Sequence, residues 1–205
     1  MTYDPRKHHR RSIRLKGWDY AGAGAYFVTI CTHRRENLFG EIVAGEMRLN
    51  DCGRVAQWYW EALPGRVPGL QLDAYVVMPN HLHGLLVLGK GEASAGQVPD
   101  HFRPRAADAS PLRPRGTERG SLGAIIQNYK SITTRRLNTV AGTPGAPVWQ
   151  RNYYEHIVRD ARALNAIRAY IRNNPFKWAL DRDNAGNTRR LPAPASAADY
   201  LADLD

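Results

Sequence analysis

Two histidines separated by one residue, His81 and His83, lie in the otherwise apolar stretch MPNHLHGLL at residues 78–86. On a β-strand, residues i and i+2 point to the same face, so the two imidazoles would lie side by side with α-carbons roughly 6.6–7 Å apart. Two imidazoles at that separation can bind one cation through bonds of about 2.0–2.2 Å. The alternative is a pair of histidines at the start of a strand, bonded to water or to backbone groups.

The segment IRAYIRNNPFKW at residues 167–178 holds a second candidate, Tyr170. Tyr170 and Asn174 are i, i+4 neighbours at the edge of an apolar helical stripe, which places the tyrosine hydroxyl at the seam between helix and sheet. The alternatives are a boundary tyrosine with a hydrated hydroxyl, and an asparagine that caps the helix before Pro175. The stripe consists of Leu164, Ile167 and Ile171.

Extended segments surround both candidates. β-branched and aromatic residues predict a strand at 25–32, and alternation around Ala44 and Gly45 predicts a hairpin at 39–49. A strand at 70–78, a turn at Pro79-Asn80 and a partner strand at 81–88 follow, and 148–158 is also extended.

Helical segments separate these strands. The pattern predicts helices from Asn50 or Asp51 to about Leu63, from Ser121 to about Asn138, and over 161–173. Asp160 caps the last of these, Pro175 ends it, and a further short helix is predicted at 196–204. The order of elements implies an α+β fold, a ferredoxin-like or RRM-like mainly antiparallel sheet with helices packed on it. The apolar face of the middle helix consists of Leu122, Ile125, Ile126, Tyr129 and Ile132.

A length of 205 residues favours one domain with appendages. We expect a basic N-terminal arm at 1–24, a domain at 25–180 and a tail at 181–205. Within the domain, residues 90–120 are rich in Gly, Pro, Ala and Arg and form a flexible insertion without periodicity.

The cysteine content and hydropathy pattern indicate a cytoplasmic protein. Only Cys31 and Cys52 are present, which argues against a disulfide framework, and the sequence starts with no signal peptide. No apolar run approaches 18 residues, so no membrane segment is expected.

The charge favours a polyanionic partner. Lys and Arg total 29 against 19 acidic residues, a formal charge of +10. The excess is clustered beside aromatic residues, as suits nucleic acid, although a basic but ordinary protein with a solubilising arm and linker is the alternative. The candidate DNA-binding residues are Arg10, Arg11, Arg14, Lys16 and Trp18 in the arm, Arg103 and Arg105 in the insertion, and Lys130, Arg135 and Arg136 on the middle helix.

Three sequence blocks together resemble a known family. His81-Leu82-His83 is a histidine–hydrophobic–histidine (HUH) motif, and MPNHLH resembles its version in single-tyrosine transposases. The block VWQRNYYEHIVR at 148–159, followed by Tyr170-Ile-x-x-Asn-Pro175, is similar to the REP-associated tyrosine transposases, relatives of the transposases of the smallest bacterial insertion sequences. The resemblance covers roughly residues 25–90 and 121–178.

The resemblance implies an HUH endonuclease and strand transferase that cleaves single-stranded DNA at the hairpins of repetitive extragenic palindromes. It makes His81, His83 and Asn174 the ligands of Mg²⁺ or Mn²⁺, and Tyr170 the nucleophile that forms a 5′-phosphotyrosine. The same histidine pair suits Zn²⁺ as well. The protein would be a monomer or a homodimer, associated with the nucleoid when bound to DNA. Tyr129, Tyr153 and Tyr154 are rival nucleophiles by residue type only, and His156 is expected to be structural or to contact DNA.

Two other functions stay open at this point. One is a domesticated, catalytically weak module that binds palindromic DNA. The other is an RNA-binding RRM-like domain, which would require exposed aromatic residues on the central strands.

Overall fold

The computed structural model describes residues 14–15, 17–89, 118–181 and 184. Several predictions from the sequence therefore fall outside the described residues. They concern Arg10, Arg11, Lys16, Arg103, Arg105, nearly all of the insertion and the helix at 196–204.

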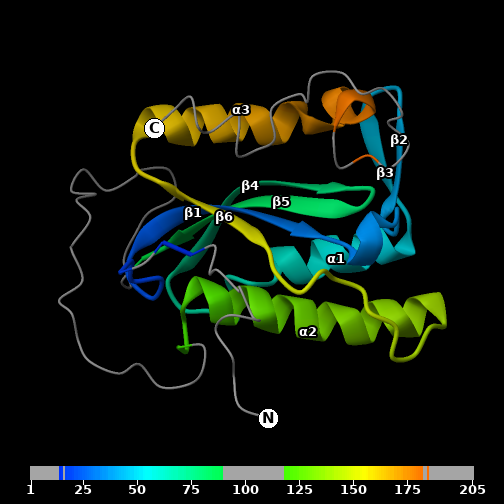
Figure 1. Cartoon of the computed structure of the whole chain (residues 1–205), viewed down its shortest axis with the longest axis horizontal. Coiled ribbons are helices and arrows are strands. Elements are labelled where there is room, and N and C mark those ends of the chain that lie inside the picture. Colours follow the sequence, from blue (N-terminus) through cyan, green and yellow to red (C-terminus); the bar gives the residue numbers. More distant parts are fainter. Residues whose placement is uncertain (1–13, 16, 90–117, 182–183, 185–205) are drawn as a thin grey trace, which may run out of the picture.

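A four-stranded antiparallel sheet forms the centre of the molecule (Figure 1). Its strands run in the order β4 (Leu70–Met78), β5 (His81–Leu88), β1 (Gly24–Cys31) and β6 (Tyr154–Val158). Along the chain, these strands and two helices follow one another as β1, helix, β4, β5, helix and β6. A hairpin joins β4 to β5, and a helix lies in each of the other two connections. This is the ferredoxin-like arrangement, and the predicted α+β fold class is confirmed.

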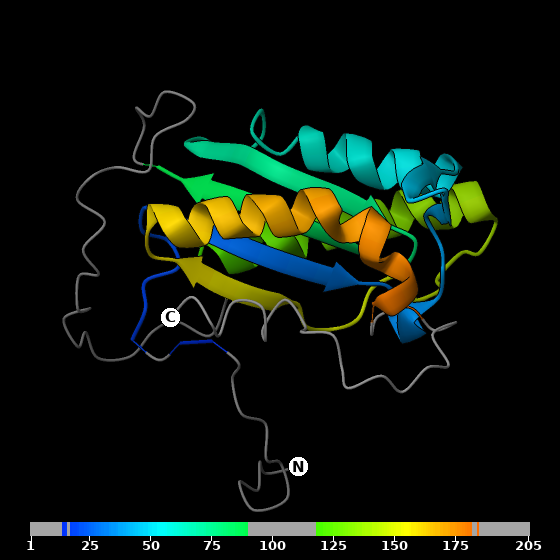
Figure 2. The ribbon, with the colours of Figure 1, turned by 90° about the horizontal axis from the view of Figure 1, so that it is seen from above.

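Helices cover both faces of the sheet. Helices α1 (Asp51–Glu61) and α2 (Leu122–Ala141) lie together on one face, and α3 (Ala161–Lys177) crosses the other (Figures 1 and 2). Each helix begins at a polar cap whose side chain accepts a backbone N–H three residues later, a bond that satisfies an otherwise unpaired donor. The caps are Asn50, Ser121 and Asp160. Among the described residues, no helix combines the length and apolar character needed to cross a bilayer.

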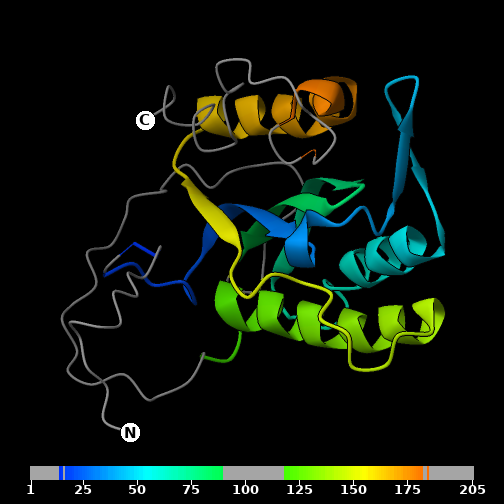
Figure 3. The same ribbon diagram turned by 45° about the vertical axis from the view of Figure 1, so that its right-hand side comes forward.

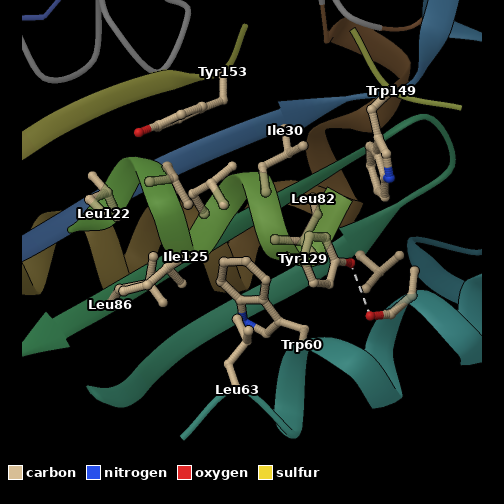
Figure 4. Packing of buried hydrophobic residues seen from close by; sticks show 14 of the residues in the cluster. Ile30, Trp60, Leu63, Leu82, Leu86, Leu122, Ile125, Tyr129, Trp149 and Tyr153 are labelled. Carbon is tan, nitrogen blue, oxygen red and sulfur yellow. Dashed lines mark hydrogen bonds between the residues drawn. The ribbon is translucent and has the colours of Figure 1, made fainter. Parts of the chain in front are cut away.

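Large aromatic residues fill the core between the sheet and the α1–α2 layer (Figure 4). Trp60 and Tyr129 meet edge to face with ring centroids 5.3 Å apart, and Leu82 and Leu86 of β5 point into the same layer. The Tyr129 hydroxyl donates a hydrogen bond of 3.0 Å to the carbonyl of Ala56, so the buried phenol is satisfied. The residues of β5 on this face are thus occupied by ordinary apolar packing.

A second, smaller core lies between the sheet and α3. The predicted stripe of Leu164, Ile167 and Ile171 is buried there against Phe27 and Leu85. Arg168 adds a bidentate ion pair with Asp73 of β4, and its Nε donates to Oδ1 over 2.8 Å. Apolar packing and one ion pair therefore dock α3 across the sheet.

A separate hairpin supports the end of α3. Strands β2 (Gly40–Val43) and β3 (Glu46–Leu49) are joined by Ala44 and Gly45, both with positive φ, as a tight hairpin turn requires. The hairpin stands beside the C-terminal end of α3 (Figure 3). A Cβ added at Gly45 would lie 2.7 Å from the Phe176 ring, so only glycine allows the turn to approach that ring.

The predicted end of the third helix is wrong. Pro175 was expected to stop it, but α3 continues to Lys177 and contains the proline in its last turn. Asn174 is therefore a buried helical residue rather than a cap, and the C-cap is Trp178. Ile171 and Asn174, just before the proline, are 1% and 2% exposed, so the end of the helix is packed on the sheet, and such tertiary packing can override a local propensity.

The described part of the N-terminal arm packs on the domain. The Trp18 indole donates to the Tyr26 hydroxyl over 3.1 Å, and Arg14 pairs with Glu155 at 2.6 Å. Tyr20 is partly buried against the main core, and its carbonyl accepts a bond from the backbone of Leu122. The folded unit thus begins before residue 25.

Gly84 offers a test of the packing behind the histidine strand. A Cβ at this position would lie 2.1 Å from the Trp60 indole, so Gly84→Ala should force β5 and α1 apart and lower the free energy of unfolding by about 1–3 kcal/mol. Urea unfolding followed by circular dichroism measures the loss. Gly65→Ala, whose Cβ would meet nothing closer than 3.8 Å, is the matched control and should change little. Equal stability of Gly84→Ala and the wild type would contradict this packing.

Candidate active site

His81 and His83 lie at the start of β5 on the face that α3 covers. Their side chains are 0% and 2% exposed, and β1 pairs Cys31 with His81 and Thr29 with His83. Leu82 between them enters the opposite core. The predicted alternation is confirmed, but the pair is buried rather than hydrated, so each ring must find its hydrogen bonds within the protein.

The outer nitrogen of each imidazole has a partner. His81 Nδ1 lies 2.8 Å from Asn80 Oδ1, and His83 Nδ1 lies 2.8 Å from the Thr29 hydroxyl. A hydroxyl can donate or accept, so Thr29 is compatible with either neutral tautomer of His83. Both rings are therefore held in place from outside, with their Nε2 atoms directed inward.

Asn80 determines the tautomer of His81. Its amide Nδ2 donates to the carbonyl of Arg35 over 3.0 Å, so its Oδ1 must face His81 and accept from Nδ1–H. The Asn80 carbonyl accepts bonds from both the backbone and the hydroxyl of Thr32. His81 Nε2 consequently carries a lone pair, the form in which an imidazole binds a metal.

Asn80 and Thr29 are supporting residues that the sequence did not single out. Asn80 was interpreted only as part of a turn, and Thr29 only as a strand residue. The same Asn80 amide also bonds to the left-handed turn at Arg34 and Arg35, where φ is 54° and 57°, through its bond to the Arg35 carbonyl. Its position directly before the first histidine was the available signal.

The two inner nitrogens face each other. His81 Nε2 and His83 Nε2 are 3.0 Å apart. One of them must carry a proton in the metal-free protein, because two lone pairs at that distance repel. If His83 changes tautomer, with Nδ1–H donating to Thr29, both Nε2 lone pairs become available to one cation.

Both imidazoles stay neutral at physiological pH. Burial lowers the pKa of His81 to about 3, and the positive charge of Arg35 contributes in the same direction, while the neighbouring Asn174 side chain partly offsets both. Burial also lowers the pKa of His83 well below its usual value, with His81 as the second cause. Neutral imidazole is the form that coordinates metals, so the electrostatics suit the predicted ligands.

Tyr170 reaches the histidine pair from α3. Its hydroxyl lies 3.4 Å from His83 Nε2, and the two rings meet at an angle with centroids 5.2 Å apart. Phe27 packs beneath both rings, stacked on His83 and edge to face with Tyr170. The hydroxyl is thus at the predicted seam between helix and sheet.

Asn174 lies one helical turn after Tyr170 and is 2% exposed. In the described part of the chain no donor satisfies its Oδ1, a buried acceptor. A buried unsatisfied acceptor costs about 1–3 kcal/mol, so its presence beside two inward-facing imidazoles calls for a partner. An amide oxygen and two imidazole nitrogens are the kinds of lone-pair donor that can bind a cation.

The donor set differs from the usual protein metal clusters. Among the described residues, no group of three or more His, Cys, Asp or Glu side chains is placed to hold an ion. The candidate site has two imidazoles and one amide oxygen instead, which leaves coordination positions open. The 3₁₀ turn η2 (Trp178–Leu180) lies beside it, with the Trp178 ring 6.0 Å from that of His81.

The other tyrosines lie in different surroundings. Tyr129 is fully buried in the opposite core, and Tyr153 is buried in the same cluster. Tyr154 is closer to the site, with its ring 6.3 Å from Phe27 on the α3 face, and His156 pairs with Phe27 across β1 and β6. Tyr154 and Tyr170 thus share Phe27 as an aromatic neighbour.

The described candidates for DNA binding are in part committed to the fold. The Lys130 ammonium donates to the carbonyls of Gln150 and Asn152, and burial lowers its pKa to about 8. Arg14 and Trp18 bond to residues of the domain, as described above. Arg135 and Arg136 are exposed on α2, away from the histidine face.

No family model matches the chain. The chain is similar to the solved structure of a REP-associated tyrosine transposase bound to a REP hairpin, with 19% identity, a TM-score of 0.45, and coverage of 82% of this chain and 72% of that chain. It is also similar to the crystal structure of a candidate transposase from Deinococcus radiodurans, with 17% identity, a TM-score of 0.40, and coverage of 79% and 97%.

A curated relative is much nearer in sequence. It is a protein of Haemophilus influenzae described as an uncharacterized protein, 40% identical over 182 residues, which span 88% of this chain and 96% of the relative. Identity at this level over nearly the whole of both proteins places them together: the chain belongs to the same family as the Haemophilus influenzae protein.

Proposed function

We propose that this protein is a metal-dependent tyrosine endonuclease and strand transferase, a transposase that acts on single-stranded palindromic DNA. The proposal depends mainly on one observation: the Tyr170 hydroxyl lies 3.4 Å from His83 Nε2. These residues are 87 positions apart in the sequence, and they come from two of the three motif blocks that resemble the REP-associated tyrosine transposases. That resemblance is also the source of the proposed substrate.

The ligands proposed for Mg²⁺ or Mn²⁺ are His81 Nε2, His83 Nε2 and Asn174 Oδ1. The neutral imidazoles, the tautomer fixed by Asn80 and the unsatisfied amide oxygen support this set. A divalent cation bound there would neutralise and polarise a phosphodiester, whose negative charge otherwise repels a nucleophile.

Tyr170 supplies the nucleophile in this proposal. Its Oη forms a bond to phosphorus while the bond from phosphorus to the 3′ oxygen breaks, giving a 5′-phosphotyrosine and a free 3′-hydroxyl. The phenol loses one proton and the 3′ oxygen gains one, so the step needs no other reactant. Because the phosphodiester bond is exchanged rather than hydrolysed, another 3′-hydroxyl can reverse the reaction, and cleavage and strand transfer share one chemistry.

The helix α3 ties the position of the nucleophile to that of the ligands. Tyr170 and Asn174 lie one turn apart on it, and the Arg168–Asp73 ion pair and the buried stripe dock it on the sheet. Holding nucleophile and ligands in one geometry removes the entropy cost of bringing them together during reaction.

An RNA-binding role of the RRM type fits the structure less well. The sheet face that would carry stacking aromatics is covered by α3, and Phe27 on it is 0% exposed. Bases cannot stack on that face without displacement of the helix.

Replacement of Tyr170 by Phe should abolish both the nick and the covalent protein–DNA adduct, because the attacking oxygen is lost while the ring packing stays. Labelled single-stranded palindromic repeats, incubated with Mn²⁺ or Mg²⁺ and separated on a denaturing gel, provide the measurement. Tyr154→Phe, a tyrosine on the same sheet face, is the control and should keep the adduct. An adduct that persists in Tyr170→Phe would refute the assigned nucleophile. Tight hairpin binding by the wild type without cleavage would favour the weakly catalytic DNA-binding module.

Replacement of Asn174 by Ala should weaken Mn²⁺ binding by roughly tenfold or more, since one ligand is lost. In the absence of metal the cavity left at this buried position should lower stability, and removal of an acceptor without a donor should offset part of that loss. Thermal unfolding with and without Mn²⁺ measures both effects. Equal stabilisation of the two proteins by Mn²⁺ would show that Asn174 is not a ligand, and His81→Ala should abolish the stabilisation.

A further inference from the structure

Helix α1 lies on the opposite side of the sheet from α3, the helix that carries Tyr170 (Figure 1). Two neighbouring aromatic residues of α1 are Trp58, which is exposed, and Tyr59, which is partly buried against the main core. Trp58 is 56% exposed, one of the few large apolar side chains in the described residues with so much exposed surface. Its ring meets that of Tyr59 edge to face with centroids 4.7 Å apart. A single exposed tryptophan is ordinary, but one that adjoins a second aromatic ring forms a contiguous surface of the kind that binding sites use.

Two guanidinium groups frame these rings. Arg66 lies over both, 5.9 Å from the Trp58 centroid and 5.3 Å from that of Tyr59. Arg136 of α2 donates from Nε to the Tyr59 hydroxyl over 3.0 Å. Together, Trp58, Tyr59, Arg66 and Arg136 form what we call the α1–α2 aromatic patch.

The patch carries positive charge that no neighbouring carboxylate neutralises. Within the described residues neither Arg66 nor Arg136 forms an ion pair. The acidic groups of α1 are engaged elsewhere: Asp51 pairs with Arg54, and Glu61 accepts bonds from Tyr75 and Gln57. The patch therefore offers flat aromatic surface and cations together, without a competing anion.

We propose that the α1–α2 aromatic patch binds unpaired nucleotides of the single-stranded DNA substrate. Bases stack on aromatic rings, Arg side chains hold the phosphates, and this combination is typical of single-strand binding surfaces. A second copy of the chain fits less well, because two such patches would bring like charges together. The partner's identity rests on the function proposed above.

The position of the patch defines its role. The sheet separates it from Tyr170 and the histidine pair, so it holds a part of the strand remote from the scissile phosphate. Its loss should weaken DNA binding and leave the rate of cleavage at saturating DNA unchanged.

The test measures binding of a fluorescein-labelled oligothymidylate about 20 nucleotides long by anisotropy, without divalent cation so that no cleavage occurs. Trp58→Ala should weaken binding by about tenfold, and Trp58→Phe, which retains a ring, should restore most of it. Val140→Ala, a partly exposed apolar residue of α2, is the matched control and should bind as the wild type does. Arg66→Ala should also weaken binding and reduce its salt dependence by about one phosphate contact.

Cleavage of the palindromic substrate by the same variants separates this inference from the proposed function. A raised KM with unchanged kcat for Trp58→Ala supports the patch. Wild-type cleavage together with equal affinities for wild type, Trp58→Ala and Arg66→Ala overturns the patch alone. A wild-type protein that neither binds nor cuts single-stranded DNA overturns both proposals.

Discussion

Two neutral imidazoles buried side by side impose the constraint on which the site depends. A buried polar nitrogen without a partner costs about 1–3 kcal/mol, and each ring has two nitrogens. Thr29 and Asn80 satisfy the outer ones, and Asn80 can do so only because the Arg35 carbonyl orients its amide. The inner nitrogens are left facing each other and Tyr170. The geometry at the centre of the site thus originates in hydrogen bonds at its periphery.

The sheet keeps two kinds of packing apart. On one face Leu82, Gly84 and Leu86 of β5 meet Trp60 and the α1–α2 layer, a dense apolar core. On the other face the histidines alternate with these residues and are covered by a single helix. The first core has the larger set of buried apolar residues, and the second combines apolar packing with polar groups that include the unsatisfied Asn174.

Sequence patterns predicted the local features well. The strands at 70–78 and 81–88, the shared face of His81 and His83, and the place of Tyr170 at the edge of the α3 stripe all follow from periods of two and 3.6 residues. These depend on the near neighbours of each residue, which a sequence displays directly.

Long-range contacts account for what the sequence did not reveal. The continuation of α3 through Pro175 accompanies burial of Ile171 and Asn174 against the sheet, whose strands lie far earlier in the chain. The supporting role of Asn80 depends on the hydrogen bond that its amide donates to the Arg35 carbonyl. The hydrogen bond from Arg136 to the Tyr59 hydroxyl depends on the packing of α1 against α2. None of these pairs has a pattern of its own in the sequence, since each is created only when the elements assemble.

The order of the elements has a consequence for synthesis of the protein. A ribosome makes β1 and β5, with Thr29, Asn80 and both histidines, long before it reaches α3, the last long helix of the described chain. Domains fold as their segments emerge, but the strand β6 and the tyrosine come only at the end. A nascent chain that ends before α3 therefore holds both imidazoles without Tyr170. The histidine pair and the Tyr170 hydroxyl can therefore come within hydrogen-bonding range only after α3 has been synthesised and has packed on the finished sheet.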